Sequence, residues 1–266
     1  MGRIEKCFET LKSEGKKGLV TFITSGDPCL ESTLRYMNSL VSAGADIIEL
    51  GVPFSDPMAD GPTIQRSSER SLLSGTDLSS IFEVVKKFRK RNDYTPIILM
   101  GYMNPFERFG FEKFAKEAKS FGVDGVLVVD LPPEESSNQN RVLRENEIGQ
   151  VFLVAPNSST RRIEMVGEFA TGFIYFVSVK GVTGDKSISA DLIKKELENV
   201  RLLTKLPIAL GFGIKTPEDA KEAVRLSDAI VVGSALVEII EMGAASEDVE
   251  NLLEKFVMEL RKAIDG

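Results

Sequence analysis

Two acidic side chains stand in adjoining segments of a chain that contains no histidine. Glu49 lies within an apolar run, and Asp60 lies in the proline- and glycine-rich loop that follows it. The absence of histidine excludes Ser-His-Asp and Cys-His nucleophile systems and histidine-ligated metals. Acid–base chemistry must therefore use Asp, Glu, Lys, Tyr or Cys, and these two carboxyl groups are the first candidates.

Glu49 is set in a sequence that predicts a buried strand. Strand alternation places Ile47, Glu49 and Gly51 on one face. A carboxyl group with little water near it has a raised pKa, so we expect it to hold a proton near neutral pH. The alternative is a glutamate neutralised by an arginine or by a helix N-terminus. The second acid in the following loop makes this alternative the weaker one.

Asp56 and Asp60 have two competing interpretations. An aspartate among prolines and glycines is most often a turn or capping residue. The spacing also begins like an EF-hand calcium loop, but Met58 stands where an oxygen ligand is expected and Ser67 where the bidentate glutamate belongs. We expect no metal site.

Apolar, β-branched runs alternate with longer amphipathic segments along the chain. The predicted strands are Gly18–Thr24, Asp46–Gly51, Pro96–Gly101, Gly125–Asp130, Gln150–Ala155, Phe173–Ser178, Leu206–Gly211 and Asp228–Gly233. The predicted helices are Glu31–Ala43, Leu78–Arg91, Phe111–Phe121, Asn138–Glu147, Thr160–Phe169, Ala190–Leu203, Pro217–Leu226 and Ser246–Ile264. This pattern predicts an α/β fold with a parallel sheet, either an open doubly wound sheet or, as eight units favour, a closed (βα)8 TIM barrel.

One further helix is predicted before the first strand. Within residues 3–14, Ile4, Cys7, Phe8 and Leu11 fall at helical spacing and are expected to close the bottom of the barrel. No linker or change of composition marks a second domain, so residues 1–266 are expected to form one barrel domain.

The composition limits which binding partners and which cellular compartment are expected. The net charge of −7 argues against a nucleic-acid partner. Cys7 and Cys29 are too few for a disulfide framework, which favours a reducing compartment. No apolar run reaches membrane-spanning length, and the N-terminus lacks a signal-peptide core, so a cytoplasmic protein is expected.

Glycine turns end the seventh and eighth predicted strands. In barrel enzymes these two loops and a short helix N-terminus usually bind a phosphate group, and Gly213, Gly233 and Ser234 could supply the donors. The sixth loop, residues 179–187, contains Thr183 and Gly184 and reads either as a lid over substrate or as an ordinary surface loop.

The motifs of the chain resemble those of the tryptophan synthase α subunit family. The residues that carry this resemblance run in the family's order over essentially the whole chain: 49–62 (ELGVPFSDPMADGP), 96–105 (PIILMGYMNP), 130–135 (DLPPEE), 181–184 (GVTG), 211–214 (GFGI) and 232–235 (VGSA). The resemblance implies a TIM-barrel lyase of tryptophan biosynthesis that splits indole-3-glycerol phosphate into indole and glyceraldehyde 3-phosphate.

The resemblance also implies roles for individual residues. Glu49 would carry the proton transfers, and Asp60 would accept a hydrogen bond from the indole nitrogen. Tyr102 would lie near these carboxylates, and Thr183 would link the closed lid to Asp60. The indole pocket would be walled by Phe22, Met100, Leu127, Tyr175 and Phe212. The phosphate would be bound by Gly184, Gly213, Gly233 and Ser234.

A partner is implied in the same way. The family passes indole to a β subunit in an α2β2 assembly, across a face that would include Asp56. No cofactor is expected in this chain, because the family's pyridoxal phosphate belongs to the β subunit. Two residues of the sixth loop depart from the family pattern: Val179 stands where many members have arginine, and Lys180 replaces a small residue. These departures put the lid interactions in question.

Other functions fit parts of the sequence. A Schiff-base aldolase would use Lys180, whose strand parity is opposite to that of Tyr175. A glycosidase could use Glu49 and Asp60, but the chain has no tryptophan to stack a sugar. A barrel kept only as an allosteric partner of a β subunit and a stand-alone indole lyase are the remaining alternatives.

Overall fold

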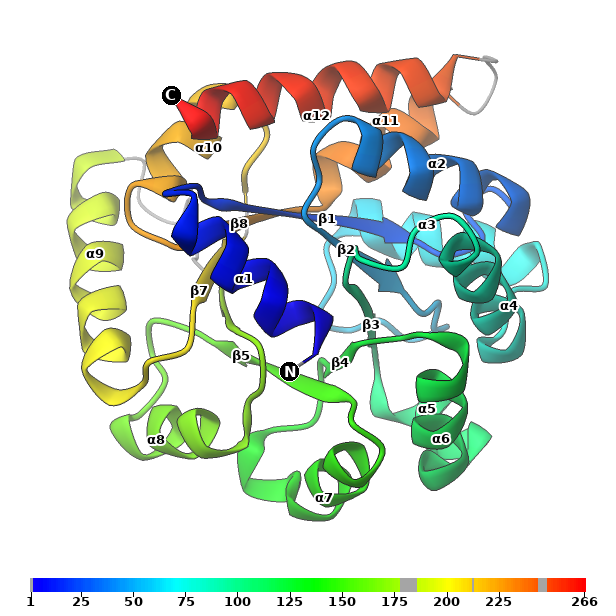
Figure 1. The fold of residues 1–266 in the computed structure, drawn as a ribbon, viewed down its shortest axis with the longest axis horizontal. Coiled ribbons are helices and arrows are strands. Elements are labelled where there is room, and N and C mark those ends of the chain that lie inside the picture. Colours follow the sequence, from blue (N-terminus) through cyan, green and yellow to red (C-terminus); the bar gives the residue numbers. More distant parts are fainter. Residues whose placement is uncertain (1, 178–185, 212, 244–247) are drawn as a thin grey trace.

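Eight parallel strands close into a barrel in chain order, with β1 beside both β2 and β8 (Figure 1). The computed structural model describes residues 2–177, 186–211, 213–243 and 248–266. The strands are β1 (Gly18–Thr24), β2 (Ile47–Gly51), β3 (Ile97–Gly101), β4 (Gly125–Val128), β5 (Gly149–Val154), β6 (Ile174–Val177), β7 (Ile208–Gly211) and β8 (Ala229–Val232). The predicted (βα)8 barrel is confirmed, and the open doubly wound sheet is excluded.

Helices surround this barrel. They are α1 (Arg3–Ser13), α2 (Leu30–Ser42), α3 (Pro62–Leu73), α4 (Leu78–Arg89), α5 (Met103–Phe109), α6 (Phe111–Phe121), η1 (Pro133–Glu135), α7 (Ser137–Glu145), α8 (Thr160–Phe169), α9 (Lys186–Leu203), α10 (Pro217–Val224), α11 (Ser234–Gly243) and α12 (Val249–Asp265). The sequence did not predict α3, α5, η1 or α11. Among the described residues, no helix is long and apolar enough to cross a membrane.

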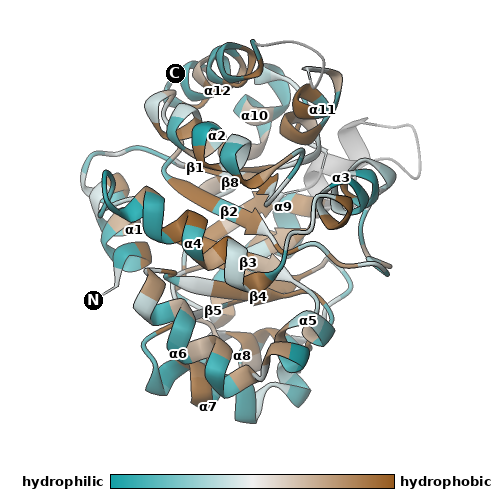
Figure 2. Ribbon diagram, turned by 90° about the vertical axis from the view of Figure 1, so that its right-hand side faces the viewer, coloured by the Kyte–Doolittle hydropathy of each residue, from teal (hydrophilic) through white to brown (hydrophobic). Residues whose placement is uncertain are grey.

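Apolar side chains form two layers of core. The larger lies between the strands and the surrounding helices, which turn their hydrophilic sides outward (Figure 2). The smaller fills the barrel itself with alternate strand residues, among them Val20, Ile47, Ile98 and Leu127. Because both faces of each strand are covered, a polar side chain that points into the barrel has little water around it.

Helix α1 closes the amino-terminal end of the barrel, as predicted, and lies across it in Figure 1. Ile4, Phe8 and Leu11 are buried in the inner core, and Cys7 packs against them. The helix is also held by an ion pair of 2.9 Å from Arg3 to Asp124. Helix α1 therefore covers the inner core at this end of the barrel.

The start of β2 is fixed to β1 by Asp46. Its carboxylate accepts a hydrogen bond of 2.8 Å from the backbone N–H of Leu19 and another of 2.8 Å from Arg261. This contact supports the register in which Phe22 lies opposite Glu49 in the sheet. The strand that carries Glu49 is thus held in place from below by charge-assisted hydrogen bonds.

Candidate active site

Glu49 is the acidic residue of β2, and its side chain points into the barrel. It follows Ile47, a residue of the inner core, by two positions and is 0% exposed. Neither carboxylate oxygen has a hydrogen-bond partner among the described residues. Burial raises the pKa of this carboxyl group from 4.5 to about 8. Glu49 is therefore protonated at neutral pH, as the apolar run around it predicts.

The hydroxyl group of Tyr175, on β6, lies in the electrostatic field of both candidate acids. The pKa of Tyr175 is raised, first by burial and then by the negative charges of Glu49 and Asp60. Phe22 pairs in register with Glu49 and lines the same cavity as Asp60, so the two acids lie beside one aromatic residue at the barrel mouth. The fold thus brings together two acids that the sequence places on a strand and in a loop.

Asp60 lies in the loop between β2 and α3 and is partly buried. The Tyr102 hydroxyl donates a hydrogen bond of 3.1 Å to Asp60 Oδ2 and accepts one of 3.0 Å from the Ala59 N–H. Burial raises the pKa of Asp60, and the bond from Tyr102 opposes that rise. For Tyr102, burial and the charge of Asp60 raise the pKa to about 12, so it remains a donor.

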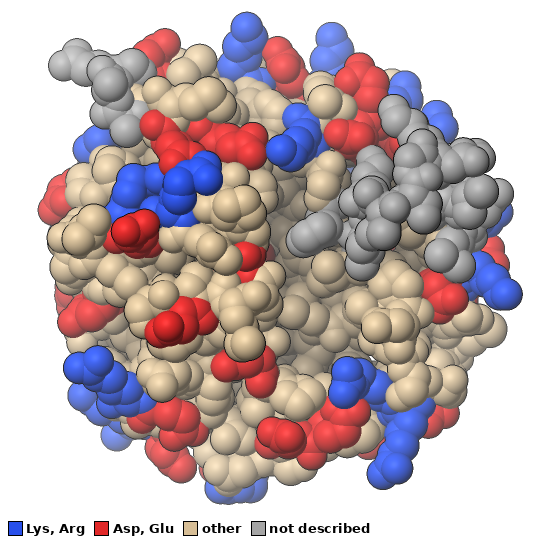
Figure 3. Space-filling model, turned by 180° about the vertical axis from the view of Figure 1, so that it is seen from behind, with Lys and Arg blue, Asp and Glu red and all other residues tan. Residues whose placement is uncertain are grey.

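A small cavity beside Asp60 has apolar walls from β1 and β3. Phe22 of β1, Met100 of β3 and Tyr102 after β3 line it together with Asp60. Leu127 lies one step deeper: it is fully buried in the inner core and pairs in register with Met100. These apolar walls and the Asp60 side chain border the same small space. This end of the molecule is hollowed near its centre (Figure 3).

Two strand-end glycines leave room for the aromatic walls. A Cβ on Gly51 would lie 2.7 Å from a ring carbon of Phe22, and one on Gly211 would lie 2.5 Å from the Tyr175 hydroxyl. Neither distance is compatible with a side chain. Glycine at these positions therefore leaves space for the aromatic rings of Phe22 and Tyr175. The sequence alone did not indicate this role.

The glycine turns of the expected phosphate site follow β7 and β8. Gly213 is exposed with φ of 80°, a conformation that favours glycine. Gly233 is half-buried, and Ser234 is the exposed first residue of α11. The first N–H groups of a helix lack intrahelical partners, so this end of α11 can donate to an anion. A Cβ added to Gly233 would lie 3.4 Å from the Phe22 Cβ, so this glycine also lies close to Phe22.

Several predicted residues lie outside the part of the chain that the structure describes. They are Thr183 and Gly184 of the sixth loop, Phe212 of the indole pocket, and the two departures Val179 and Lys180. Their predicted roles remain predictions.

The cavity has walls that the sequence analysis missed. Thr24 and Val129 line it and stand two positions beyond Phe22 and Leu127, so strand alternation could have found them. Phe54 also lines the cavity, with its ring 5.4 Å from that of Tyr102. Ile64 and Ser68 come from α3, a helix that the sequence did not predict.

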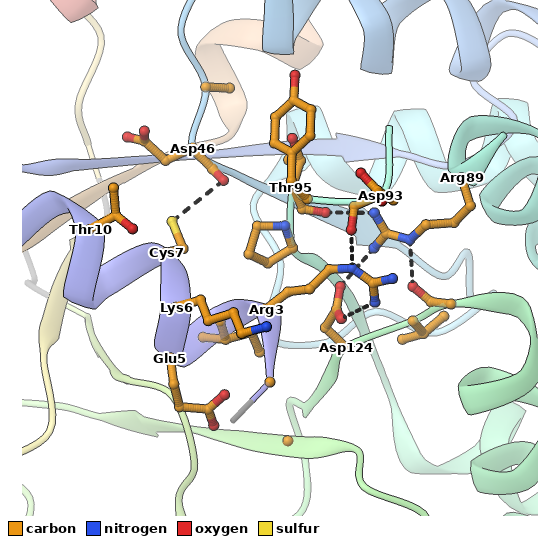
Figure 4. A pocket seen from close by; sticks show the side chains of 18 of the residues that line it. Arg3, Glu5, Lys6, Cys7, Thr10, Asp46, Arg89, Asp93, Thr95 and Asp124 are labelled. Atoms are coloured by element: carbon orange, nitrogen blue, oxygen red, sulfur yellow. Dashed lines mark hydrogen bonds and ion pairs between the residues drawn. The ribbon is translucent and has the colours of Figure 1, made fainter. Parts of the chain in front are cut away.

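A much larger groove lies at the opposite end of the barrel, beside α1 (Figure 4). Its charged side chains pair with one another: Asp124 accepts hydrogen bonds from Arg3 and from Arg89, at 2.9 and 2.7 Å. Neither Glu49 nor Asp60 lines it, and of the two acids Asp60 alone lines the small cavity. Size therefore does not identify the active site, and the small cavity that holds Asp60 is the candidate.

Comparison with known proteins leads to one family. The family model described as tryptophan synthase alpha chain matches residues 8–265. The chain is 48% identical over 266 residues to the tryptophan synthase alpha chain of Paraburkholderia phytofirmans, with 100% of this chain and 98% of the relative covered.

Solved structures of tryptophan synthase have the same fold as this chain. Tryptophan synthase subunit alpha from Legionella pneumophila superposes with a TM-score of 0.93 at 40% identity, covering 100% of this chain and 99% of that one. A chain of the tryptophan synthase complex from Pyrococcus furiosus gives a TM-score of 0.81 at 39% identity, covering 92% and 98%. Together with the closed barrel and the buried Glu49, these similarities show that the chain belongs to the tryptophan synthase alpha chain family, a family of lyases in tryptophan biosynthesis.

Proposed function

We propose that Glu49 and Asp60 carry the family's reaction, the cleavage of indole-3-glycerol phosphate to indole and glyceraldehyde 3-phosphate. The observation that supports this most strongly is Glu49 itself. A carboxyl group that is 0% exposed, without a hydrogen-bond partner among the described residues, is costly to keep in a core. Such a cost is typical of a functional group whose partner is the substrate.

The reaction requires one proton to be delivered and one to be removed. Protonated Glu49 gives its proton to C3 of the indole ring, which makes an indolenine with positive charge at nitrogen. The resulting carboxylate takes the proton of the hydroxyl group on the carbon attached to C3. The electrons of the broken carbon–carbon bond return to the ring, and that carbon becomes the aldehyde of glyceraldehyde 3-phosphate. Glu49 ends protonated, as it began.

Asp60 stabilises the charge that develops at the ring nitrogen. As a carboxylate it accepts the indole N–H hydrogen bond, which strengthens when the ring is protonated. Tyr102 supports this role because its hydroxyl donates to Oδ2 of Asp60 at 3.1 Å, leaving Oδ1 for the substrate. In this proposal Phe22, Met100, Leu127 and Tyr175 form the indole walls, together with Phe212.

The phosphate group is assigned to the ends of β7 and β8. We expect the N-terminus of α11 with Gly233 and Ser234, and the turn at Gly213, to donate hydrogen bonds to it. Gly184 of the sixth loop completes this set, and Thr183 links the lid to Asp60. Both assignments depend on the family resemblance alone.

A β subunit completes the proposal. The Pyrococcus furiosus relative is described as part of a tryptophan synthase complex. We extend this to an α2β2 assembly in the cytoplasm, with pyridoxal phosphate in the β subunit. The exposed loop that holds Asp56 and Met58, which is 86% exposed, offers a contact surface beside the barrel mouth. Residues 1–266 act as one barrel domain.

Indole release by purified protein tests the proposal. We expect Glu49→Gln to lower kcat at least about 100-fold, because proton transfer by a placed side chain contributes 10²–10⁴-fold. Asp60→Asn should cost about 100-fold. Glu69→Gln, an exposed change of the same kind on α3, is the matched control and should retain full activity. Wild-type activity of Glu49→Gln would contradict the proposal.

Two additions to this assay separate the alternatives. Added β subunit should bind the chain and increase indole release; a stand-alone lyase would neither bind nor respond. Borohydride trapping of substrate on Lys180, with activity surviving Glu49→Gln, would instead establish a Schiff-base aldolase. The free enzyme's kcat/KM should fall above about pH 8, where Glu49 loses its proton.

A further inference from the structure

Helix α3 is packed against the barrel by hydroxyl groups. Its buried residues are Ser67, Ser68 and Ser71, while Leu73 is 83% exposed. A surface helix normally buries an apolar stripe, and α3 does not. Directional contacts must therefore decide where this helix lies.

These contacts are made with four successive residues at the end of β1 and in the loop after it. Helix α3 and the residue after it supply four partners for residues 24–27: Ser67 Oγ with Thr24 Oγ1 at 2.6 Å, Ser71 Oγ with the Ser25 carbonyl, Ser74 Oγ with the Gly26 carbonyl at 3.0 Å, and Arg70 with Asp27. Hydrogen bonds at this spacing allow one position of the helix along the loop, because a shift of one turn would break all of them.

Arg70 makes the strongest of these contacts. Its Nε and Nη2 donate to the two carboxylate oxygens of Asp27, at 2.8 and 2.7 Å, and Asp27 is 1% exposed. The remaining arm, Nη1, donates to Glu241 of α11 at 2.8 Å. A bidentate guanidinium–carboxylate pair fixes angle as well as distance. Arg70 thus joins α3 to the β1 loop and to the helix whose N-terminus we assign to phosphate.

Helix α3 in turn holds Asp60. The side-chain amide of Gln65 donates to the Asp60 carbonyl at 2.8 Å, and the helix begins at Pro62, two residues after Asp60. Ile64 and Ser68 of the same helix line the cavity beside Asp60. Any displacement of α3 therefore moves the carboxylate and one wall of the pocket together.

We infer that Arg70 is a positioning residue for the cleavage reaction: by fixing α3 to the buried Asp27, it places the Asp60 carboxylate against the indole nitrogen. The inference rests on the proposed role of Asp60. Arg70 does not line the cavity, so it acts through α3 and not by contact with substrate.

Steady-state indole release on Arg70→Met tests the inference. We expect kcat to fall about 10- to 100-fold with a smaller change in KM, since misplacement by about 1 Å can cost 100-fold. Arg66→Met is the matched control. Arg66 is one turn earlier and donates two hydrogen bonds to the same Glu241, both at 2.7 Å, but does not contact Asp27. It should leave kcat unchanged.

Unfolding measurements separate positioning from folding. Arg70→Met leaves the buried Asp27 carboxylate unpaired, which lowers the melting temperature. Adding Asp27→Asn removes that charge, so the double variant should regain most of the lost melting temperature but none of the lost kcat. Recovery of both together would overturn the inference, because Arg70 would then matter only for folding.

The Asp60→Asn background shows whether Arg70 acts through Asp60. There we expect Arg70→Met to change kcat by less than about threefold, since coupled residues are not additive. An undiminished effect in that background, or wild-type kcat for Arg70→Met alone, would overturn the inference. Full activity of Asp60→Asn itself would instead show that the proposed role of Asp60 fails.

Discussion

Two consecutive helices between β2 and β3 are held to the barrel in different ways. The buried residues of α4 are Leu78, Ile81, Phe82, Val84, Val85 and Phe88, whereas those of α3 are three serines. Apolar burial stabilises strongly but has no direction, while a hydrogen bond adds little net stability and fixes geometry. Stability and active-site geometry therefore depend on different elements of the same βα unit.

The N-termini of α3 and α4 also differ in how they are stabilised. Asp77 begins α4 with a capping box, in which its side chain accepts from the Ser80 N–H at 2.8 Å. Gly61, before α3, makes no such bond. Helix α4 is stabilised by its own sequence, and α3 depends on partners elsewhere in the chain. Of the following four changes, three test this contrast and Glu49→Gln tests the buried acid of β2; they run from the largest expected effect on stability to the smallest.

Phe82→Ala in α4 should cost stability without affecting catalysis. Phe82 is 0% exposed, and its ring stacks 5.3 Å from that of Phe121. Removing a buried aromatic side chain costs about 3–5 kcal/mol. Urea unfolding should show this loss, while kcat stays at the wild-type value at a temperature where the variant is folded. A large fall in kcat under those conditions would contradict the separation of roles.

Glu49→Gln should make the protein more stable. The folded-state pKa of Glu49, about 8, is above the value of 4.5 for an unfolded chain, so folding requires proton uptake between these values. Stability is therefore lost as the pH rises from about 4.5 to 8, and glutamine avoids that loss. At pH 7 the gain is on the order of 3 kcal/mol, and it disappears below about pH 4. Urea unfolding of both proteins at pH 4 and 7 measures it; an equal difference at both values would show that Glu49 does not hold this proton.

Ser71→Ala in α3 should lower the catalytic rate while costing less stability than Phe82→Ala does. It removes the bond to the Ser25 carbonyl and leaves a buried acceptor without that partner. The expected cost is about 1–2 kcal/mol of stability. Indole release should nevertheless fall about tenfold, because α3 loses part of its register and Asp60 moves with it. A variant that loses stability but keeps wild-type kcat would place α3 among the purely structural helices.

Asp77→Ala should have the smallest effect. Loss of an N-cap costs about 1 kcal/mol. Asp77 begins α4, which does not line the active-site cavity, so kcat and KM should not change. A thermal melt and one Michaelis curve are sufficient. A changed KM would mean that α4 also helps to place the pocket.

The contrast between α3 and α4 also explains what the sequence could predict. All eight strands were found, and α4 was predicted to begin at Leu78 as it does, because apolar periodicity reports burial directly. Helix α3 was missed because hydroxyl groups, not apolar side chains, cover its buried face. A helix held by polar contacts to a distant loop leaves no periodic apolar signal in its own sequence.

The site shows a similar division. Glu49 stands out from the sequence alone, because one carboxyl group interrupts a buried strand. The bond between Tyr102 and Asp60 joins residues 42 positions apart and depends on how β3 aligns with β2, so no local pattern predicts it. No local pattern explains the glycine at position 211 either, because a side chain there is excluded by Tyr175, which belongs to the neighbouring strand.

The protonation state of Glu49 is the most direct test of the account. An infrared titration of wild type minus Glu49→Gln isolates the carbonyl band of this one protonated carboxyl group. We expect this band to persist through neutral pH and to be half lost at about pH 8. A band already lost near pH 4.5 would contradict it, because Glu49 would then have no proton to give to the indole ring.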